Sequence, residues 1–157
     1  MIVLRELTSD DWAEWRELRL EALREAPEAF GSKLADWLDA PEPRWRGRLV
    51  DVPFNVLAEY EGKPAGMASG SALDESGTVQ LLSMWVAPFA RGQGVADALL
   101  EAVVEWARGV GAARVGLLVY EANARAAALY RRQGFVEVSL ADGERVMGRV
   151  LSGDSRR

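Results

Sequence analysis

The sequence contains no cysteine and no histidine in its 157 residues. Without cysteine the chain cannot form a disulfide, bind a metal through thiolates or use a cysteine nucleophile. Without histidine it has neither a Ser-His-Asp triad nor a histidine-ligated zinc, and it lacks the most common general base. Any chemistry therefore falls to carboxylates, hydroxyls, backbone groups or water, and we expect no bound metal.

Long apolar runs and an excess of positive charge are also missing. No run approaches 18 apolar residues, and the first residues do not resemble a signal peptide, so we expect no membrane association and a cytoplasmic location. The net charge of −5 makes nucleic acid an unexpected partner, because an anionic surface repels phosphates. The length and the 49% of hydrophobic residues predict one globular domain over residues 1–151, with 152–157 as a frayed tail.

The order of the expected elements defines the fold class. Alternating residues predict a strand over 2–7, and Thr8, three residues before Asp11, predicts a capped helix to about Ala26. The elements expected next are short helices within 37–50, strands at 55–60, 64–73 and 79–86, a helix at 95–110, a strand at 115–120, a helix at 124–132, and strands at 135–140 and 145–151. Helical crossovers from 86 to 115 and from 120 to 135 suit locally parallel strands. This order predicts a mixed α/β sheet with helices on both faces.

A glycine-rich segment, Arg91-Gly92-Gln93-Gly94-Val95-Ala96, lies between an apolar strand and the clearest helix. The first turn of a helix offers unpaired N–H groups and the positive end of the helix dipole, and glycines let a ligand approach the backbone. The segment therefore predicts an anion site, although it could also simply start a helix. It is not a P-loop, and Asp97 breaks the dinucleotide fingerprint. We expect Asp97 to point away from the anion.

Two motifs together resemble those of the GCN5-related N-acetyltransferase (GNAT) superfamily. Arg91-x-x-Gly94-x-Ala96 is similar to its coenzyme A pyrophosphate loop. A second block, with Asn123-Ala124, Leu129-Tyr130 and Gly134-Phe135, is similar to its second cofactor segment, and the order of elements agrees over nearly the whole chain. The resemblance implies a mostly antiparallel sheet with a splayed parallel pair of strands, acetyl-CoA as the acyl donor, and a homodimer as one assembly common in the family.

The resemblance also implies roles for individual residues. Tyr130 would protonate the leaving thiolate as general acid, and Asn123 would contact the cofactor arm or cap the helix that follows it. An N–H near Val86 would polarise the thioester carbonyl, and a neutral amine would attack it directly. The residues expected to bind the cofactor are Val86, Arg91, Gly92, Gln93, Gly94, Val95, Ala96, Asn123 and Tyr130.

The general base and the acceptor are less defined. Some relatives carry a glutamate where this chain has Leu118, which cannot accept a proton. The candidates are therefore Glu59, whose position beside a turn favours a solvated edge residue over a base, and a chain of waters to a backbone carbonyl. Phe30, Ser32 and Trp37 are the expected acceptor contacts. The resemblance implies that the acceptor is a primary amine of a small molecule or a peptide. A sensor that binds acyl-CoA without turnover, and a transferase that uses another acyl-CoA, remain as alternatives.

Overall fold

The computed structural model describes residues 1–30 and 33–151. Seven strands form one sheet in the order β1-β2-β3-β4-β5-β7-β6, and every neighbouring pair is antiparallel except β4 and β5. The strands are β1 Ile2–Glu6, β2 Phe54–Tyr60, β3 Lys63–Gly70, β4 Thr78–Val86, β5 Arg114–Tyr120, β6 Val136–Ala141 and β7 Glu144–Val150. The expected mixed α/β sheet, mostly antiparallel with one parallel pair, is confirmed. Ser32 and the expected tail at 152–157 lie outside the described residues.

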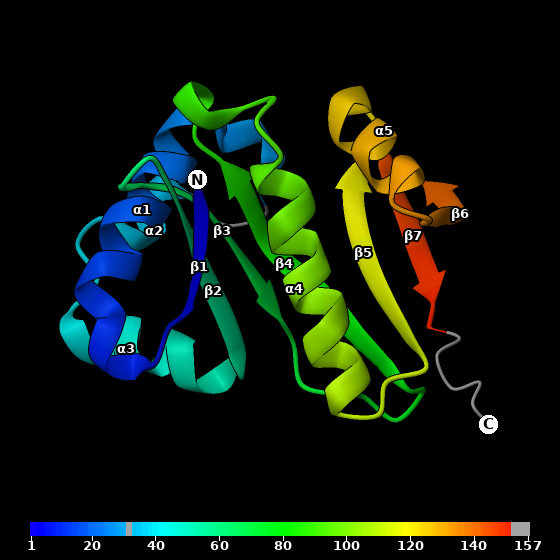
Figure 1. Ribbon diagram of the computed structural model, residues 1–157, viewed down its shortest axis with the longest axis horizontal. Helices are drawn as coiled ribbons and strands as arrows, with labels where there is room; N and C mark the ends of the chain where they lie inside the picture. The colour runs from blue at the N-terminus through cyan, green and yellow to red at the C-terminus, as the bar shows by residue number, and fades with distance from the viewer. Residues whose placement is uncertain (31–32, 152–157) are drawn as a thin grey trace.

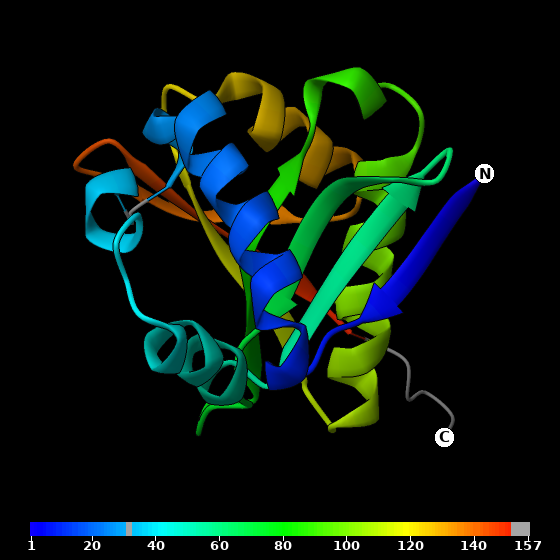
Figure 2. The same ribbon diagram turned by 90° about the vertical axis from the view of Figure 1, so that its left-hand side faces the viewer.

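Helices cover both faces of the sheet, as Figures 1 and 2 show. On one face lie α4 (Val95–Gly109) and α5 (Ala124–Arg132). On the other lie α1 (Trp12–Glu25), α2 (Leu34–Trp37) and α3 (Glu42–Asp51). Three short 3-10 turns, η1 Ser9–Asp11, η2 Pro27–Ala29 and η3 Pro88–Ala90, lead into or out of these helices. Within the described residues, no helix is both long and apolar enough to cross a bilayer.

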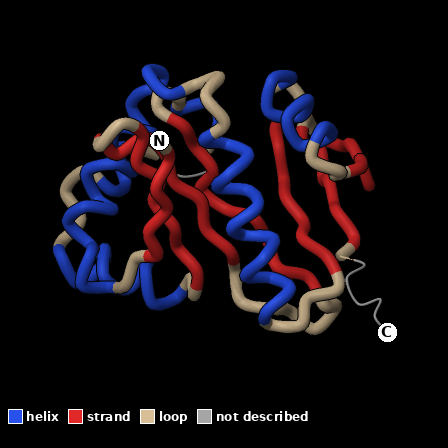
Figure 3. The backbone as a smooth tube through the Cα atoms, in the orientation of Figure 1, coloured by secondary structure: helices blue, strands red, loops and turns tan. Residues whose placement is uncertain are grey.

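The parallel pair β4 and β5 stays together over only part of its length. The strands pair from Thr78 opposite Arg114 to Gln80 opposite Gly116, and then continue to Val86 and Tyr120 without further pairing to each other. The tube in Figure 3 shows them separating toward the end where α4 begins and α5 lies. This is the splay that the resemblance implied, and it opens the sheet between two strands.

Close packing of α4 on the sheet fixes the position of its first turn. Val95, Leu99 and Val103 are buried at helical spacing against β2, β3 and β4. Gly66 in β3 allows the approach, because a Cβ there would lie 2.8 Å from the carbonyl oxygen of Trp85 and 3.0 Å from Leu99. Each such apolar side chain contributes about 1.5–3 kcal/mol on full burial, so the helix start is held rigidly over the end of β4.

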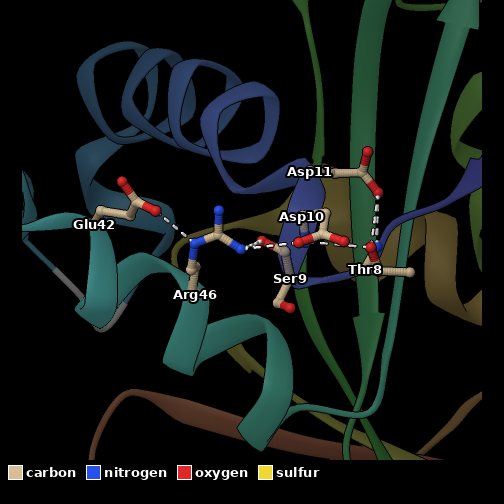
Figure 4. A network of polar contacts seen from close by, with 6 residues as sticks. All are labelled: Thr8, Ser9, Asp10, Asp11, Glu42 and Arg46. Atoms are coloured by element: carbon tan, nitrogen blue, oxygen red, sulfur yellow. Dashed lines mark hydrogen bonds and ion pairs between the residues drawn. The ribbon is translucent and has the colours of Figure 1, made fainter.

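A polar network joins the start of α1 to α3 (Figure 4). Thr8 and Asp11 form the expected capping box. Arg46 of α3 donates to the Asp10 carboxylate at 3.0 Å, to the Ser9 carbonyl at 3.3 Å and to Glu42 at 2.7 Å. Exposed ion pairs contribute up to about 1 kcal/mol each, so the network orients α3 beside α1 more than it stabilises the fold.

The structure differs from the sequence-based expectation at the second crossover. β5 and β6 run in the same direction but are not neighbours, because β7 lies between them. The hairpin turn at Asp142 and Gly143 returns the chain along β5, where β7 pairs from Glu144 opposite Tyr120 to Val150 opposite Arg114. The strand expected over 64–73 also ends earlier, at Gly70.

Candidate active site

The separated ends of β4 and β5 border a cleft of about 860 Å³. It is lined by the end of β4, the first turn of α4, the end of β5, one face of α5 and the end of α1. Most of the residues predicted to bind the cofactor line it, namely Val86, Arg91, Gly92, Gly94, Ala96, Asn123 and Tyr130. The segments 91–96 and 123–130, which are more than 25 residues apart in the sequence, thus meet at one site.

The first turn of α4 and the loop before it present two glycines and unpaired backbone N–H groups to this cleft, beside the side chains of Ala96 and Asp97. Gly92 and Gly94 have φ angles of +80° and +89°, which L-residues rarely adopt, and no other residue lies within 4 Å of a Cβ built on Gly92. The Ala98 N–H bonds to the Gly94 carbonyl at 3.1 Å, and the N–H groups before it have no partner inside the helix. The result is an open cradle with positive potential, suited to an anion.

Two of the expected cofactor residues point their side chains elsewhere. The Gln93 side chain accepts a hydrogen bond from the Tyr60 hydroxyl at 3.1 Å, and Val95 is buried in the core. Only their backbone groups are therefore available to a ligand. Tyr60 and Gln93 tie the loop to the end of β2.

Arg91 lies across the end of β4 and is held there by Glu25, which the sequence analysis missed. The Arg91 guanidinium donates to the Val86 carbonyl at 3.0 Å and to the Glu25 carboxylate at 2.7 Å, and Trp85 Nε1 donates to the same carboxylate oxygen at 2.9 Å. The hydrogen bonds from Arg91 and Trp85 lower the pKa of Glu25, so it is charged at neutral pH. Nothing local in the sequence of α1 marks Glu25, because its partners are more than 50 residues away.

Tyr130 and Asn123 face the cleft from α5. Tyr130 is buried, its ring lies 5.9 Å from that of Phe135, and burial raises the pKa of its phenol. It therefore stays protonated at neutral pH and is available as a hydrogen-bond donor. Asn123 caps α5, with its Oδ1 accepting from the Ala126 N–H at 3.2 Å, while it also lines the cleft.

Asp97 does not turn away from the cleft as expected, but its charge is neutralised. It lines the cleft, and its carboxylate accepts hydrogen bonds from Arg132 at 3.0 Å and Gln133 at 2.7 Å. These contacts join the first turn of α4 to the end of α5. The expectation was wrong because the arginine that compensates Asp97 lies 35 residues away.

The structure does not bring the candidate base Glu59, or the expected acceptor contacts Phe30 and Trp37, into this cleft. Glu59 lies on the α1 face, 3.9 Å from the Arg5 guanidinium. The Phe30 ring packs under the Arg19 guanidinium at 4.6 Å, and Trp37 packs against Trp45 with ring centroids 4.7 Å apart. No cluster of three metal-ligating side chains occurs among residues 1–30 and 33–151.

Comparison with known proteins places this geometry in a family. The profile of the Acetyltransferase (GNAT) family matches residues 5–135, and the chain belongs to this family. An uncharacterized N-acetyltransferase of Methanocaldococcus jannaschii is 28% identical over 147 residues, which cover 89% of this chain and 63% of that protein. The chain thus spans less than two thirds of that relative.

Two further similarities extend the comparison. The aminoglycoside N(6')-acetyltransferase type 1 of Klebsiella aerogenes is 29% identical over 144 residues, covering 87% of this chain and 91% of that protein. The crystal structure of the PaiA N-acetyltransferase of Thermoplasma acidophilum in complex with coenzyme A superposes with a TM-score of 0.78. That superposition covers 96% of this chain and 99% of the other at 15% identity, so it shows a shared fold.

Proposed function

We propose that the protein transfers an acetyl group from acetyl-CoA to a primary amine of a small molecule or peptide. The observation that carries the proposal is the cleft between β4 and β5, which has an anion cradle at Gly92 and Gly94 and a buried phenol, Tyr130, on its wall. Members of the family act on amines of these kinds. The cradle fits a pyrophosphate, because unpaired backbone N–H groups lie at the cleft beside two glycines that leave the backbone accessible.

The cofactor would supply an activated thioester, and the chain would position it. The N–H groups around Gly94 would bind the pyrophosphate, and backbone groups near Val86 would hold the arm and polarise the carbonyl. A neutral amine would form the C–N bond while the C–S bond breaks, losing one proton to water. Tyr130 would donate its proton to the departing thiolate, whose sulfur ends as a thiol, and the phenolate would regain a proton from water, so that the proton lost by the amine is balanced.

Arg91 must move for this arrangement to form. Its contact with the Val86 carbonyl occupies a backbone acceptor that the cofactor arm would use. We infer that the anionic pyrophosphate draws Arg91 away from Val86 and Glu25. Glu25 then acts as a positioning residue that holds Arg91 while the cleft is empty. Its lowered pKa makes it a weak base, so a water chain is the better route for the amine proton than Glu25 or the distant Glu59.

The test is a calorimetric titration with acetyl-CoA of the wild type, of Gly94→Glu and of a control, Gly109→Glu, at the exposed far end of the same helix. Binding by the wild type and the control, but not by Gly94→Glu, supports the cofactor site. Release of free thiol with an amine panel then supports transfer. Failure of the wild type to bind acetyl-CoA would reject the proposal, and binding without transfer to any amine would favour a sensor.

We also propose that the protein forms a homodimer through its β6 edge. Val136, Val138 and Leu140 are exposed on this terminal strand of the sheet. An apolar edge strand with unpaired backbone groups favours pairing with a second chain.

A further inference from the structure

Two arginines on the α1 face of the sheet form no ion pair with a carboxylate among residues 1–30 and 33–151. Arg19 of α1 is only 8% exposed, and among the described residues its Nη1 is buried without a hydrogen-bond partner. Its guanidinium packs on the Phe30 ring at 4.6 Å. Arg48 of α3 donates only to neutral oxygens, those of Asn55 at 2.9 Å, Ser83 at 3.0 Å and Ser69 at 3.3 Å.

The burial of these two cations is unusual for a chain that carries a net charge of −5. Other arginines, such as Arg46, Arg91 and Arg132, are bound to carboxylates. Burial lowers the pKa of Arg19 to about 10, with repulsion by Arg48 adding to the effect. Burial likewise lowers the pKa of Arg48 to about 10, although Asp51 opposes the shift. Buried cations are normally compensated by an anion, so the interior of this face lacks a negative charge.

Each arginine contacts a residue whose neighbour in the sequence lines the cleft. Arg48 holds Ser83, whose φ of +55° marks the bulge in β4, and the next residue, Met84, lines the cleft. On the other side, Phe30, which covers Arg19, follows directly on Ala29, which also lines the cleft. An anion bound between the arginines would therefore lie just across β4 from the proposed thioester position.

We propose that the acceptor is an amine that carries a carboxylate, an amino acid in the simplest case, and that Arg19 and Arg48 bind this carboxylate. The inference rests on the proposed acetyl transfer and names its substrate class. The planar fork of an arginine matches a carboxylate with two parallel hydrogen bonds. Arg19 has Nη1 without a partner among the described residues and could donate it to the carboxylate. Arg48 adds positive charge while it remains hydrogen-bonded to Ser83 at the β4 bulge. The amine of the same molecule would then face the thioester across Met84.

The experiment compares each L-amino acid that has a primary amine with its own carboxamide as acetyl acceptor, by thiol release. The enzymes are the wild type, Arg19→Met, and Arg24→Met as a control at an exposed position of the same helix. In the wild type we expect at least one amino acid to be used at least about tenfold better than its carboxamide, as kcat/KM. Arg19→Met should reduce this ratio to near one, mainly by raising KM for the acid, and leave KM for acetyl-CoA unchanged. Arg24→Met should keep the wild-type ratio.

The outcomes separate this inference from the proposed function. If the wild type does not bind acetyl-CoA in the calorimeter, acetyl transfer itself is rejected. If it binds acetyl-CoA and acetylates amines, but uses acids and carboxamides equally or prefers O-phosphoethanolamine to every amino acid, the carboxylate site is rejected. An unchanged ratio in Arg19→Met also overturns it. If Arg19→Met does not fold, Arg19→Lys replaces it, because lysine keeps the positive charge but lacks the planar guanidinium. A ratio of acid to carboxamide kcat/KM that is not reduced in Arg19→Lys would likewise overturn the inference.

Discussion

Replacing Arg19 by methionine should make the protein more stable, although most substitutions of buried residues are destabilising. Arg19 places a guanidinium in the interior, and its Nη1 has no hydrogen-bond partner among the described residues. The charged group that affects its pKa is another cation, Arg48. Methionine has a similar length, is apolar and adapts to irregular space. It would keep most of the packing around Leu18 and Phe30 and remove the buried charge.

The magnitude follows from the pKa of Arg19. At about 1.36 kcal/mol for each pKa unit, lowering the pKa of Arg19 from its ordinary value to about 10 destabilises the charged form by about 3 kcal/mol. The loss of the contact with Phe30 removes about 0.5–1 kcal/mol. The folded-state pKa of Arg19 is below the unfolded value, so this cost is fully present below about pH 10 and declines as the pH rises above the folded-state pKa toward the unfolded one. We therefore expect the free energy of unfolding to rise by about 1–3 kcal/mol at pH 7.

Urea denaturation at pH 7, followed by fluorescence of the six tryptophans, measures this change. A gain of about 1–3 kcal/mol corresponds to a Tm higher by roughly 2–10 °C. The control, Arg24→Met on the exposed side of α1, should change the free energy by less than about 0.5 kcal/mol. A loss of more than about 1 kcal/mol in Arg19→Met would refute the reasoning, because it would mean that the guanidinium is well paired in the folded protein.

Four further predictions concern the cleft and the sheet edge. Tyr130→Phe should lower kcat by about 10²-fold or more and leave acetyl-CoA binding within about twofold, as steady-state kinetics and calorimetry would show; an unchanged kcat removes Tyr130 as the acid. Glu25→Gln should tighten acetyl-CoA binding by up to about fivefold, because it frees Arg91 from an ion pair that contributes at most about 1 kcal/mol; weaker binding would mean that Glu25 supports the bound state. Gly94→Ala should cost about 1–2 kcal/mol of stability in thermal unfolding, since alanine is strained at φ +89°; no loss would show that the turn rearranges. Val138→Lys on the β6 edge should shift sedimentation from dimer to monomer, and a dimer that persists would exclude this edge.

Much of the fold could be predicted from local sequence. The bounds of α5 are those expected, and those of α4 and β5 differ from expectation by one residue at one end, because periodicity, glycine and asparagine at helix ends act over a few residues. The glycines of the α4 turn were recognisable for the same reason. The position of β7 between β5 and β6 was not, because strand order depends on pairing between distant segments.

The candidate site divides in the same way. The sequence by itself determined the cradle at Gly92 and Gly94 and the cap at Asn123, since each needs only its own segment to adopt a turn or a helix start. Only the tertiary structure decided that Glu25 holds Arg91 across 66 residues of sequence and that Asp97 is neutralised from α5. The uncompensated charge of Arg19 likewise exists only once α1 and α3 pack on the sheet, because burial and the distance between charges are properties of the folded chain and leave no periodic trace in its sequence.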